Sequence, residues 1–374
     1  MKPVAASGGA PIRVLVVDDS VVIRRLVSSM IDDDPELEVV GVAANGKIAL
    51  QRIRQLRPDI VTLDVEMPEL DGLGTLAQLR PEFPNLPVVM FSTLTAKGAA
   101  ATLDALAKGA SDYVAKPANV GSVTEAMERV RDDLVPKLKA LCRRSPVESR
   151  LSAPGTVTPL RPPTPRRAPA SRVELVAIGS STGGPNALGD VLSVLPGDLP
   201  VPVVIVQHMP AVFTRLLAER LDDRCAVRVR EAADGDVLAA GHVYIAPGDY
   251  HLTVARDGTR LRLSTNQEPP VHFCRPSVDV MFGSLVDSVG AGVLAVVLTG
   301  MGSDGRDGAG ALRASGAVVL AQDEPTSVVW GMPGAVVNAG LADEVLALSD
   351  VGPRIAAVVR GRADAGRNQR ELSA

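Results

Sequence analysis

Short apolar runs alternate with stretches of helical periodicity in the first part of the chain. The runs are rich in β-branched residues, which is typical of buried strands in a parallel sheet. They lie at Ile12–Val17, Leu37–Ala43, Ile60–Leu63, Val88–Phe91 and Asp112–Ala115. Apolar residues recur at helical spacing at Val21–Met30, Lys47–Leu56, Leu73–Leu79, Ala99–Lys108 and Val123–Leu141. This alternation predicts a doubly wound parallel α/β sheet with its functional site at the carboxyl ends of the strands.

The same alternation returns in the last part of the chain. Apolar runs that predict strands lie at Leu175–Ile178, Val201–Val206, Val243–Ala246, Val293–Leu298 and Val318–Ala321. Helical spacing follows at Asn186–Leu195, Phe213–Leu221 and Gly308–Ser315. A second parallel α/β domain is therefore expected.

Composition separates the two parts of the chain and limits the classes of protein to which it can belong. Between residues 143 and 172 there are seven Arg, seven Pro and a single acid, Glu148, so this segment is expected to be a solvated linker. We place the domains at residues 11–141 and 173–364, with the linker at 142–172.

A net charge of −4 and 2% aromatic residues give no sign of nucleic-acid binding. Three widely spaced cysteines, and no apolar stretch of membrane-spanning length, favour a cytoplasmic protein.

Charged and hydroxyl side chains follow the predicted strands of the first domain. Asp18 and Asp19 end the first strand, Asp64 the third, Ser92 the fourth and Lys116, before Pro117, the fifth. Carboxylates gathered at one sheet edge suit Mg²⁺, and a lysine and a hydroxyl beside them can hold a phosphoryl group on Asp64. A single Asp at a strand end is more often a helix cap, but this set is too large for that explanation.

At these residues the chain resembles the receiver domain of response regulators. The motifs are VDDS, LDVEMPELDG, FST and DYVAKP, and the resemblance spans about Ile12–Leu134. It implies a flavodoxin-like fold and phosphorylation of Asp64. It implies a Mg²⁺ site formed by Asp18, Asp19, Asp64 and the backbone of Glu66. It also implies a switch formed by Ser92, Tyr113 and Lys116.

A glycine-rich turn follows the first predicted strand of the second domain. Gly179-Ser180-Ser181-Thr182-Gly183 fits the G-x-S-x-G nucleophile elbow in register. The turn allows Ser181 to point out from the strand end, and the following helix offers amides for a developing oxyanion. The alternative is a phosphate-binding loop, although the turn lacks the Walker lysine and the G-x-G-x-x-G spacing.

Two further side chains lie beyond strand ends in the second domain. His208 follows Val201–Val206, and Asp304 follows Val293–Leu298 in a glycine-rich loop. A serine nucleophile needs a base, and a carboxylate fixes the tautomer of that base, so Ser181, His208 and Asp304 are the expected triad. His242, His251 and His272 fit this role less well, and Asp249, Asp279 and Asp307 are the fallback acids. The loop Gly300–Gly308 could instead bind a phosphate.

A second resemblance lies in the motifs AIGSSTGG, VQHMP, YIAPGDYH, RPSVDVMF and LTGMGSDG. They are similar to the catalytic domain of chemotaxis protein-glutamate methylesterases. The resemblance implies a Rossmann-like α/β hydrolase domain, the triad Ser181, His208 and Asp304, and the amides of Met301 and Thr182 as oxyanion donors. Ser180 stands where many relatives have Ala, and the arginine-rich linker is not part of the family pattern.

Together the resemblances imply a phosphorylation-controlled serine hydrolase that demethylates glutamate γ-methyl esters, and deamidates glutamines, on chemoreceptors. They imply a chemotaxis histidine kinase as phosphodonor, methylated receptor cytoplasmic domains as substrate, and no cofactor at the esterase site. Neither nucleic-acid binding nor membrane insertion is expected. The unphosphorylated receiver is expected to cover the Ser181 crevice. The alternative is a non-enzymatic signalling adaptor that binds a partner through its glycine loops and needs neither Ser181 nor His208.

Overall fold

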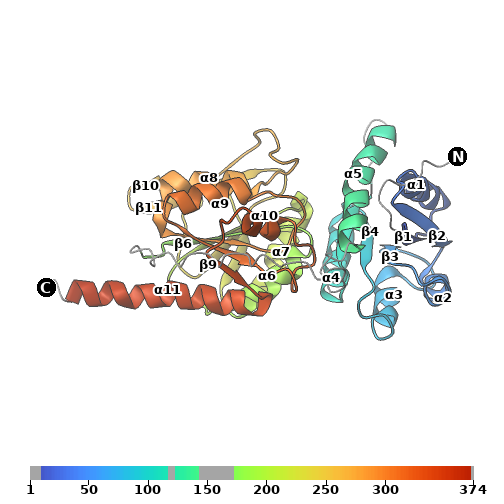
Figure 1. The fold of residues 1–374 in the computed structure, drawn as a ribbon, viewed down its shortest axis with the longest axis horizontal. Helices are drawn as coiled ribbons and strands as arrows, with labels where there is room; N and C mark the ends of the chain where they lie inside the picture. The colour runs from blue at the N-terminus through green and yellow to red at the C-terminus, as the bar shows by residue number, and fades with distance from the viewer. Residues whose placement is uncertain (1–9, 117–122, 143–171, 372–374) are drawn as a thin grey trace, which may run out of the picture. The chain divides into compact units, whose positions relative to one another are not determined.

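The computed structural model describes residues 10–116, 123–142 and 172–371, which form two compact units (Figure 1). Each unit is an α/β fold of its own. The segment 143–171, which covers almost all of the predicted linker, lies outside the described residues, as does Pro117. None of the helices in the described ranges is long and apolar enough to cross a membrane.

The first unit is built on a parallel sheet with the strand order β2-β1-β3-β4-β5. The strands are β1 (Ile12–Val17), β2 (Leu37–Ala43), β3 (Ile60–Asp64), β4 (Val88–Ser92) and β5 (Asp112–Ala115). The helices are α1 (Val21–Asp32), α2 (Gly46–Leu56), α3 (Gly72–Leu79), α4 (Ala96–Ala107) and α5 (Val123–Cys142). The predicted doubly wound sheet is confirmed.

The helices of the first unit pack on the sheet as its sequence periodicity requires. Helices α1 and α5 pack against each other and close an apolar core over one face, around Ile31, Leu134 and Val89. Helix α3 packs against both α2 and α4. Polar N-caps begin the helices that follow β1 to β4, namely Ser20, Asn45, Asp71 and Thr95. These caps satisfy amides at the helix starts, next to the strand ends.

The second unit contains a parallel sheet with the order β14-β13-β12-β6-β7-β9-β8. Its strands are β6 (Leu175–Ser180), β7 (Val203–Gln207), β8 (Arg228–Glu231), β9 (His242–Ile245), β12 (Val293–Val297), β13 (Val318–Gln322) and β14 (Glu344–Leu346). An antiparallel ribbon of β10 (His251–Asp257) and β11 (Arg260–Asn266) is added to it. Because β6 lies between β12 and β7, the three strands that precede Asp304, Ser181 and His208 are neighbours.

Helices lie along this sheet between its strands. They are α6 (Gly184–Ser193), α7 (Ala211–Arg224), α8 (Val278–Ser288), α9 (Arg306–Ala314), α10 (Met332–Asn338) and α11 (Leu348–Glu371), with a short 3₁₀ turn, η2 (Gly290–Gly292). A large core cluster joins α8, α9, α10 and the ribbon to the sheet, with Phe282 and Met281 fully buried. Helix α6 packs against both α7 and α11. The second predicted parallel α/β domain is therefore present, and β8, β11 and β14 are the strands that the sequence pattern did not predict.

Candidate active site and phosphorylation site

Ser181 is the first residue after strand β6, which extends through Gly179 and Ser180 beyond its predicted end. The left-handed backbone of the turn falls on Gly183, with φ 77°, and not on the serine. A Cβ at Gly183 would approach Val328 to 2.6 Å, so both conformation and space require glycine there. Helix α6 then begins at Gly184. The predicted strand, turn and helix are all present, with the serine at the carboxyl end of the strand.

A glutamine that the sequence analysis missed holds this turn in place. Gln207 ends β7 and is buried, and its Oε1 accepts a hydrogen bond from Ser180 Oγ at 2.7 Å. Its Nε2 donates to the backbone oxygen of Ser181 at 2.9 Å. A polar residue ending the apolar run VVIVQ was the only available signal. Gln207, which directly precedes His208 in the sequence, therefore holds the backbone at Ser181 in place.

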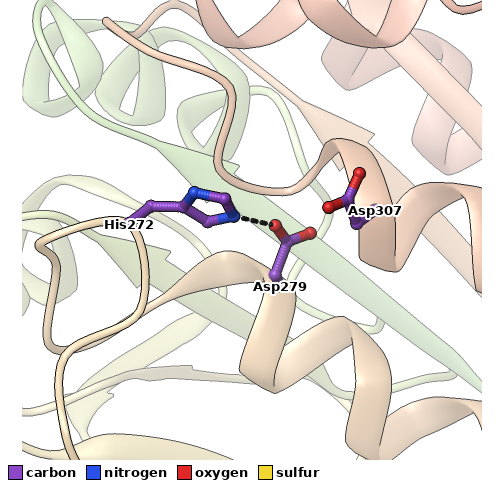
Figure 2. Close-up of side chains that lie close together, drawn as sticks. All are labelled: His272, Asp279 and Asp307. Carbon is purple, nitrogen blue, oxygen red and sulfur yellow. Dashed lines mark hydrogen bonds and ion pairs between the residues drawn. The ribbon is translucent and has the colours of Figure 1, made fainter.

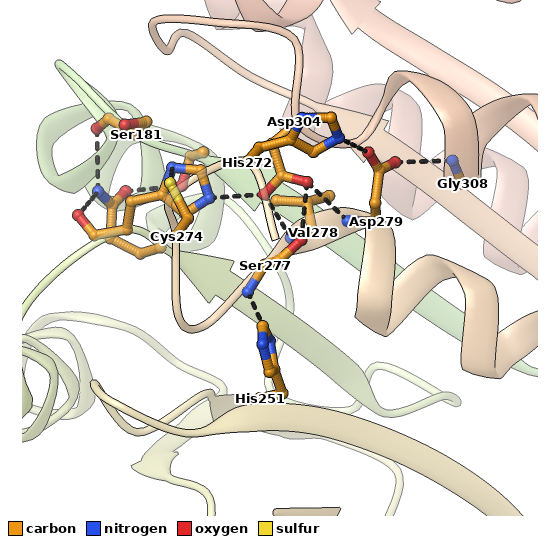
Figure 3. Close-up of polar contacts among 12 residues, drawn as sticks. Ser181, His251, His272, Cys274, Ser277, Val278, Asp279, Asp304 and Gly308 are labelled. Carbon is orange, nitrogen blue, oxygen red and sulfur yellow. Dashed lines mark hydrogen bonds and ion pairs between the residues drawn. The ribbon is translucent and has the colours of Figure 1, made fainter. Parts of the chain in front are cut away.

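His208 is paired with Asp304. His208 Nε2 lies 2.8 Å from Asp304 Oδ2, and both side chains are almost completely buried. Asp304 also receives hydrogen bonds from Ser277 Oγ and from the amides of Val278 and Asp279, at 2.8, 2.7 and 2.9 Å (Figure 3). These donors form the start of α8, where the helix dipole favours a negative charge. Asp304 is thus a fixed acceptor for one nitrogen of His208.

The charge state of Asp304 follows from these contacts. Burial opposes its ionisation, but His208 and the amides of Asp279 and Val278 outweigh burial and lower the pKa of Asp304 to about 2. The carboxylate therefore stays ionised across the physiological range. It can orient the imidazole and stabilise it when it is protonated.

The fallback acids contact residues other than His208. Asp249 is bound by Arg275 at 2.6 Å, Asp307 by Arg306 at 2.8 Å, and Asp279 by His272 at 3.0 Å. His272, Asp279 and Asp307 place ligand atoms within 4.8 Å of one another (Figure 2). Their existing ion pairs, together with the bond from the Gly308 amide to Asp279, satisfy these carboxylates, so we assign no metal to them.

The remaining histidines bond to groups outside the triad. His251 accepts from the amide of Ser277 and contacts the backbone oxygen of Pro269, and His242 contacts the backbone oxygen of Ala240. Among the described residues, His208 is thus the histidine that the structure brings to Asp304. His251 supports the site indirectly, through the backbone of Ser277.

The loop after β12 is bonded to the elbow. The Ser181 amide donates to the backbone oxygen of Thr299 at 3.0 Å, and Thr299 Oγ1 donates to the backbone oxygen of Thr182 at 2.9 Å. The two expected oxyanion donors, Thr182 and Met301, therefore lie on adjoining loops at one edge of the sheet. His208 Nδ1 lies 3.5 Å from Cys274 Sγ, a contact that the sequence gave no reason to expect.

The raised pKa of His208 predicts how the rate of ester hydrolysis depends on pH. Burial opposes protonation of the imidazole, but Asp304 and Cys274 outweigh burial and raise its pKa from 6.5 to about 9. Since a general base has to be neutral, kcat/KM for ester hydrolysis is expected to rise with pH up to about 9 and then level off.

A pH profile corrected for the uncatalysed rate tests this, and a rate that is already constant from pH 6 to 8 would contradict it. The same shift stabilises the fold. That contribution is fully present below the ordinary pKa of 6.5 and is lost as the pH rises through about 9.

The acids of the first unit meet at one edge of its sheet. Lys116 Nζ lies 2.8 Å from Asp18 Oδ2 and 2.7 Å from Asp64 Oδ2, and Asp18, Asp19 and Asp64 lie within 4.8 Å of one another. Burial outweighs the effect of Lys116 and raises the pKa of Asp64 to about 6. Three carboxylates beside one lysine leave an excess of negative charge, so this donor set fits a divalent cation that prefers oxygen ligands. The Glu66 backbone adjoins it, since its amide lies 3.4 Å from Asp64 Oδ1.

The expected switch residues lie inside the same unit. Ser92 is fully buried, and its Oγ donates to the backbone oxygen of Gly98 at 3.1 Å, at the start of α4. Tyr113 is buried, and burial raises the pKa of its hydroxyl well above 10. Lys137 Nζ donates to the Tyr113 backbone oxygen at 2.7 Å and lies 5.3 Å from the ring centre. Ser92 and Lys116 are joined to one another through the bond from the Lys116 amide to the Ser92 oxygen.

Comparison with known families agrees with both units. Residues 176–355 match the CheB methylesterase family, and residues 14–128 match the response regulator receiver domain. A protein-glutamate methylesterase/protein-glutamine glutaminase from Nocardioides sp. is 55% identical over 349 residues, which are 92% of this chain and 94% of that protein. The chain belongs to the CheB methylesterase family.

Other members of the CheB family give the same result. A protein-glutamate methylesterase/protein-glutamine glutaminase from Trichodesmium erythraeum is 48% identical over 343 residues, covering 92% of this chain and 97% of that protein. The crystal structure of the CheB methylesterase catalytic domain of Thermotoga maritima is 39% identical with a TM-score of 0.50. It covers 50% of this chain and 100% of that chain. Both resemblances drawn from the motifs are therefore confirmed.

Proposed function

We propose that this CheB family chain hydrolyses glutamate γ-methyl esters on chemoreceptors with Ser181 as nucleophile, and that it deamidates receptor glutamines at the same site. The activities for which its relatives are named support the reaction class. The observation that carries the proposal is the buried His208–Asp304 pair, whose members follow β7 and β12, the two strands on either side of the β6 strand that leads to Ser181. A base held by a carboxylate beside an accessible serine is the arrangement that acyl transfer requires.

The reaction follows from the chemistry of these groups. Ser181 Oγ attacks the ester carbonyl while His208 Nδ1 takes its proton, because Nε2 is bonded to Asp304. The amides of Met301 and Thr182 stabilise the oxyanion. His208 then gives the proton to the leaving oxygen of the ester, which departs as methanol, or to the leaving nitrogen of a glutamine, which departs as ammonia. Water activated by His208 hydrolyses the acyl-enzyme and restores Ser181.

The receiver unit supplies the control. Asp64 accepts a phosphoryl group from a chemotaxis histidine kinase, and Asp18, Asp19, Asp64 and the backbone of Glu66 would hold Mg²⁺. When bound, this ion neutralises the oxygens of the transferring phosphoryl group. Lys116, already in contact with Asp64, pairs with the phosphoryl oxygens, and Ser92 and Tyr113 respond to its arrival. Because the proposed substrate is the cytoplasmic part of the receptors, we expect the protein to act in the cytoplasm.

Covalent labelling by an organophosphate-type probe tests the esterase assignment against the adaptor alternative. The account predicts time-dependent addition of one probe to the peptide that contains Ser181, and none in the Ser181→Ala variant. Ser193→Ala is the matched control, because Ser193 is an exposed serine on α6 that follows the same elbow. A folded protein that never labels at Ser181 would favour the adaptor.

Removal of the receiver is expected to raise the basal esterase rate. If the unphosphorylated receiver restrains the esterase, a fragment that begins at Arg172 will be about 5- to 150-fold faster than the unphosphorylated chain, the range of a typical coupling free energy. Its methanol release will also be indifferent to a phosphodonor. A fragment no faster than the whole chain would show that the receiver acts by assembling the site or recruiting substrate.

A further inference from the structure

The second ring nitrogen of His208 is in contact with a cysteine. Cys274 Sγ lies 3.5 Å from His208 Nδ1, which is within reach of a hydrogen bond to sulfur. Since Nε2 is bonded to Asp304, Nδ1 is the nitrogen that has to accept the proton of Ser181. Within the described part of the chain, no hydrogen bond joins the Ser181 hydroxyl to His208. The base is therefore engaged by sulfur and not by the nucleophile.

The backbone holds Cys274 in this position. Val271 and Cys274 exchange two backbone hydrogen bonds, at 3.1 and 2.9 Å, which close a two-residue hairpin. Its central residues, His272 and Phe273, have φ values of 51° and 62°, a left-handed conformation that non-glycine residues adopt at a cost in energy. Such strain persists where the surroundings determine the conformation. The position of the thiol is thus set by the fold and not by a free rotamer alone.

The hairpin is also tied to the other side of the triad. His272 Nε2 contacts Asp279 Oδ2 at 3.0 Å (Figure 2). The backbone amide of the same Asp279 donates to Asp304 at 2.9 Å (Figure 3). One side of the hairpin therefore leads to Asp304 and the other contacts His208. This arrangement keeps Cys274 in contact with the imidazole of His208.

The sulfur contact occupies the base. The Cys274 thiol is a donor to the Nδ1 lone pair, which is the position that the proton of Ser181 has to reach. Nδ1 is therefore unable to accept a proton from Ser181 until the sulfur contact breaks.

We propose that Cys274 competes with Ser181 for His208 Nδ1 and so holds the esterase in a resting arrangement. Cys274 is a positioning residue that acts through His208, and the inference rests on the proposed role of Ser181 and His208. It predicts that this chain has a slower basal rate than the same chain without the sulfur. A substrate carbonyl that draws the Ser181 hydroxyl toward Nδ1 displaces the thiol.

The test is Cys274→Ala in the full chain, measured by the rate of Ser181 labelling with the organophosphate-type probe and by methanol release. Loss of one competing hydrogen bond is expected to speed both about five-fold. The acid limb of the pH profile should also move to lower pH, since Asp304 and Cys274 are the two titratable groups that contact His208. Asp279, His272 and His251 lie one contact further away and are unchanged. A purely structural role for Cys274 would not move this limb.

Two further variants keep the result interpretable. Cys225→Ala removes a free, half-buried cysteine at the end of α7 and is expected to leave rate and pH profile unchanged. Cys274→Ser retains a weaker competitor, so its labelling rate should fall between those of the wild type and Cys274→Ala. Labelling in folded Cys274→Ala that is no faster than in the wild type, with the same acid limb, overturns the competition. Absence of Ser181 labelling in the wild type overturns the proposed function instead.

Discussion

Replacing Ser181 with alanine is expected to lower methanol release by a factor of about 10⁴ or more while the protein stays folded. The Ser181 hydroxyl is the proposed nucleophile, whereas the neighbouring Ser180 hydroxyl donates its hydrogen bond to Gln207. Gln207 contacts the backbone of Ser181 and the side chain of Ser180, so the elbow keeps its support in the variant. The measurement is methanol release from methylated receptor membranes by variants with normal circular dichroism.

The other members of the triad set the controls for this result. His208→Ala and Asp304→Asn are expected to lose a comparable factor, because the first removes the base and the second removes the acceptor that fixes its tautomer. Ser193→Ala should retain full activity, since Ser193 is exposed and its hydroxyl donates to the backbone oxygen of Asp190 within α6. Turnover by Ser181→Ala close to that of the wild type would rule out the triad.

Replacing Asp64 with asparagine is expected to eliminate labelling by a small-molecule phosphodonor. Asparagine fills nearly the same space beside Lys116 but offers no carboxylate to form the acyl phosphate. Removal of divalent ions by a chelator should have the same effect on the wild type, since Lys116 alone does not balance the carboxylates around Asp64. The measurement is incorporation of the labelled phosphoryl group into the intact chain.

Asp132→Asn is the matched control for the phosphorylation experiment. Asp132 lies exposed on α5 and is paired only with its neighbour Arg131, so its loss should leave labelling unchanged. Labelling of Asp64→Asn to the wild-type extent would place the acceptor on another residue. Labelling that survives complete chelation would show that the carboxylate cluster works without the metal.

The parallel sheets could be predicted because buried parallel strands are apolar on both faces. Leu37–Ala43 and Asp112–Ala115 have the predicted bounds. Two features were beyond that signal. Strand β8 (Arg228–Glu231) has one buried position among four, and the β10–β11 ribbon alternates apolar residues with arginines and polar residues. Their pairing depends on tertiary contacts that a pattern of apolar runs does not encode.

The positions of the reactive groups could be predicted because each group follows the end of a strand. The residues that hold these groups in place could not be predicted in this way. Asp304 could be chosen because a parallel sheet brings loop residues after neighbouring strands together. Its donors come from the start of α8, which is far away in sequence. Cys274 reaches His208 through a hairpin whose left-handed residues, His272 and Phe273, are not glycines, so the sequence did not indicate the geometry of this turn. The role of Gln207 could not be predicted, because the sequence shows it only as one polar residue at the end of an apolar strand.

Methanol release from methylated chemoreceptor membranes, measured with the full chain before and after addition of a small-molecule phosphodonor, tests the central claim most directly. The account predicts slow release by the unphosphorylated protein, faster release with phosphodonor, and none above background in Ser181→Ala under either condition. Folded, phosphorylated wild-type protein that releases no methanol would contradict the account and leave a receiver-controlled adaptor in its place.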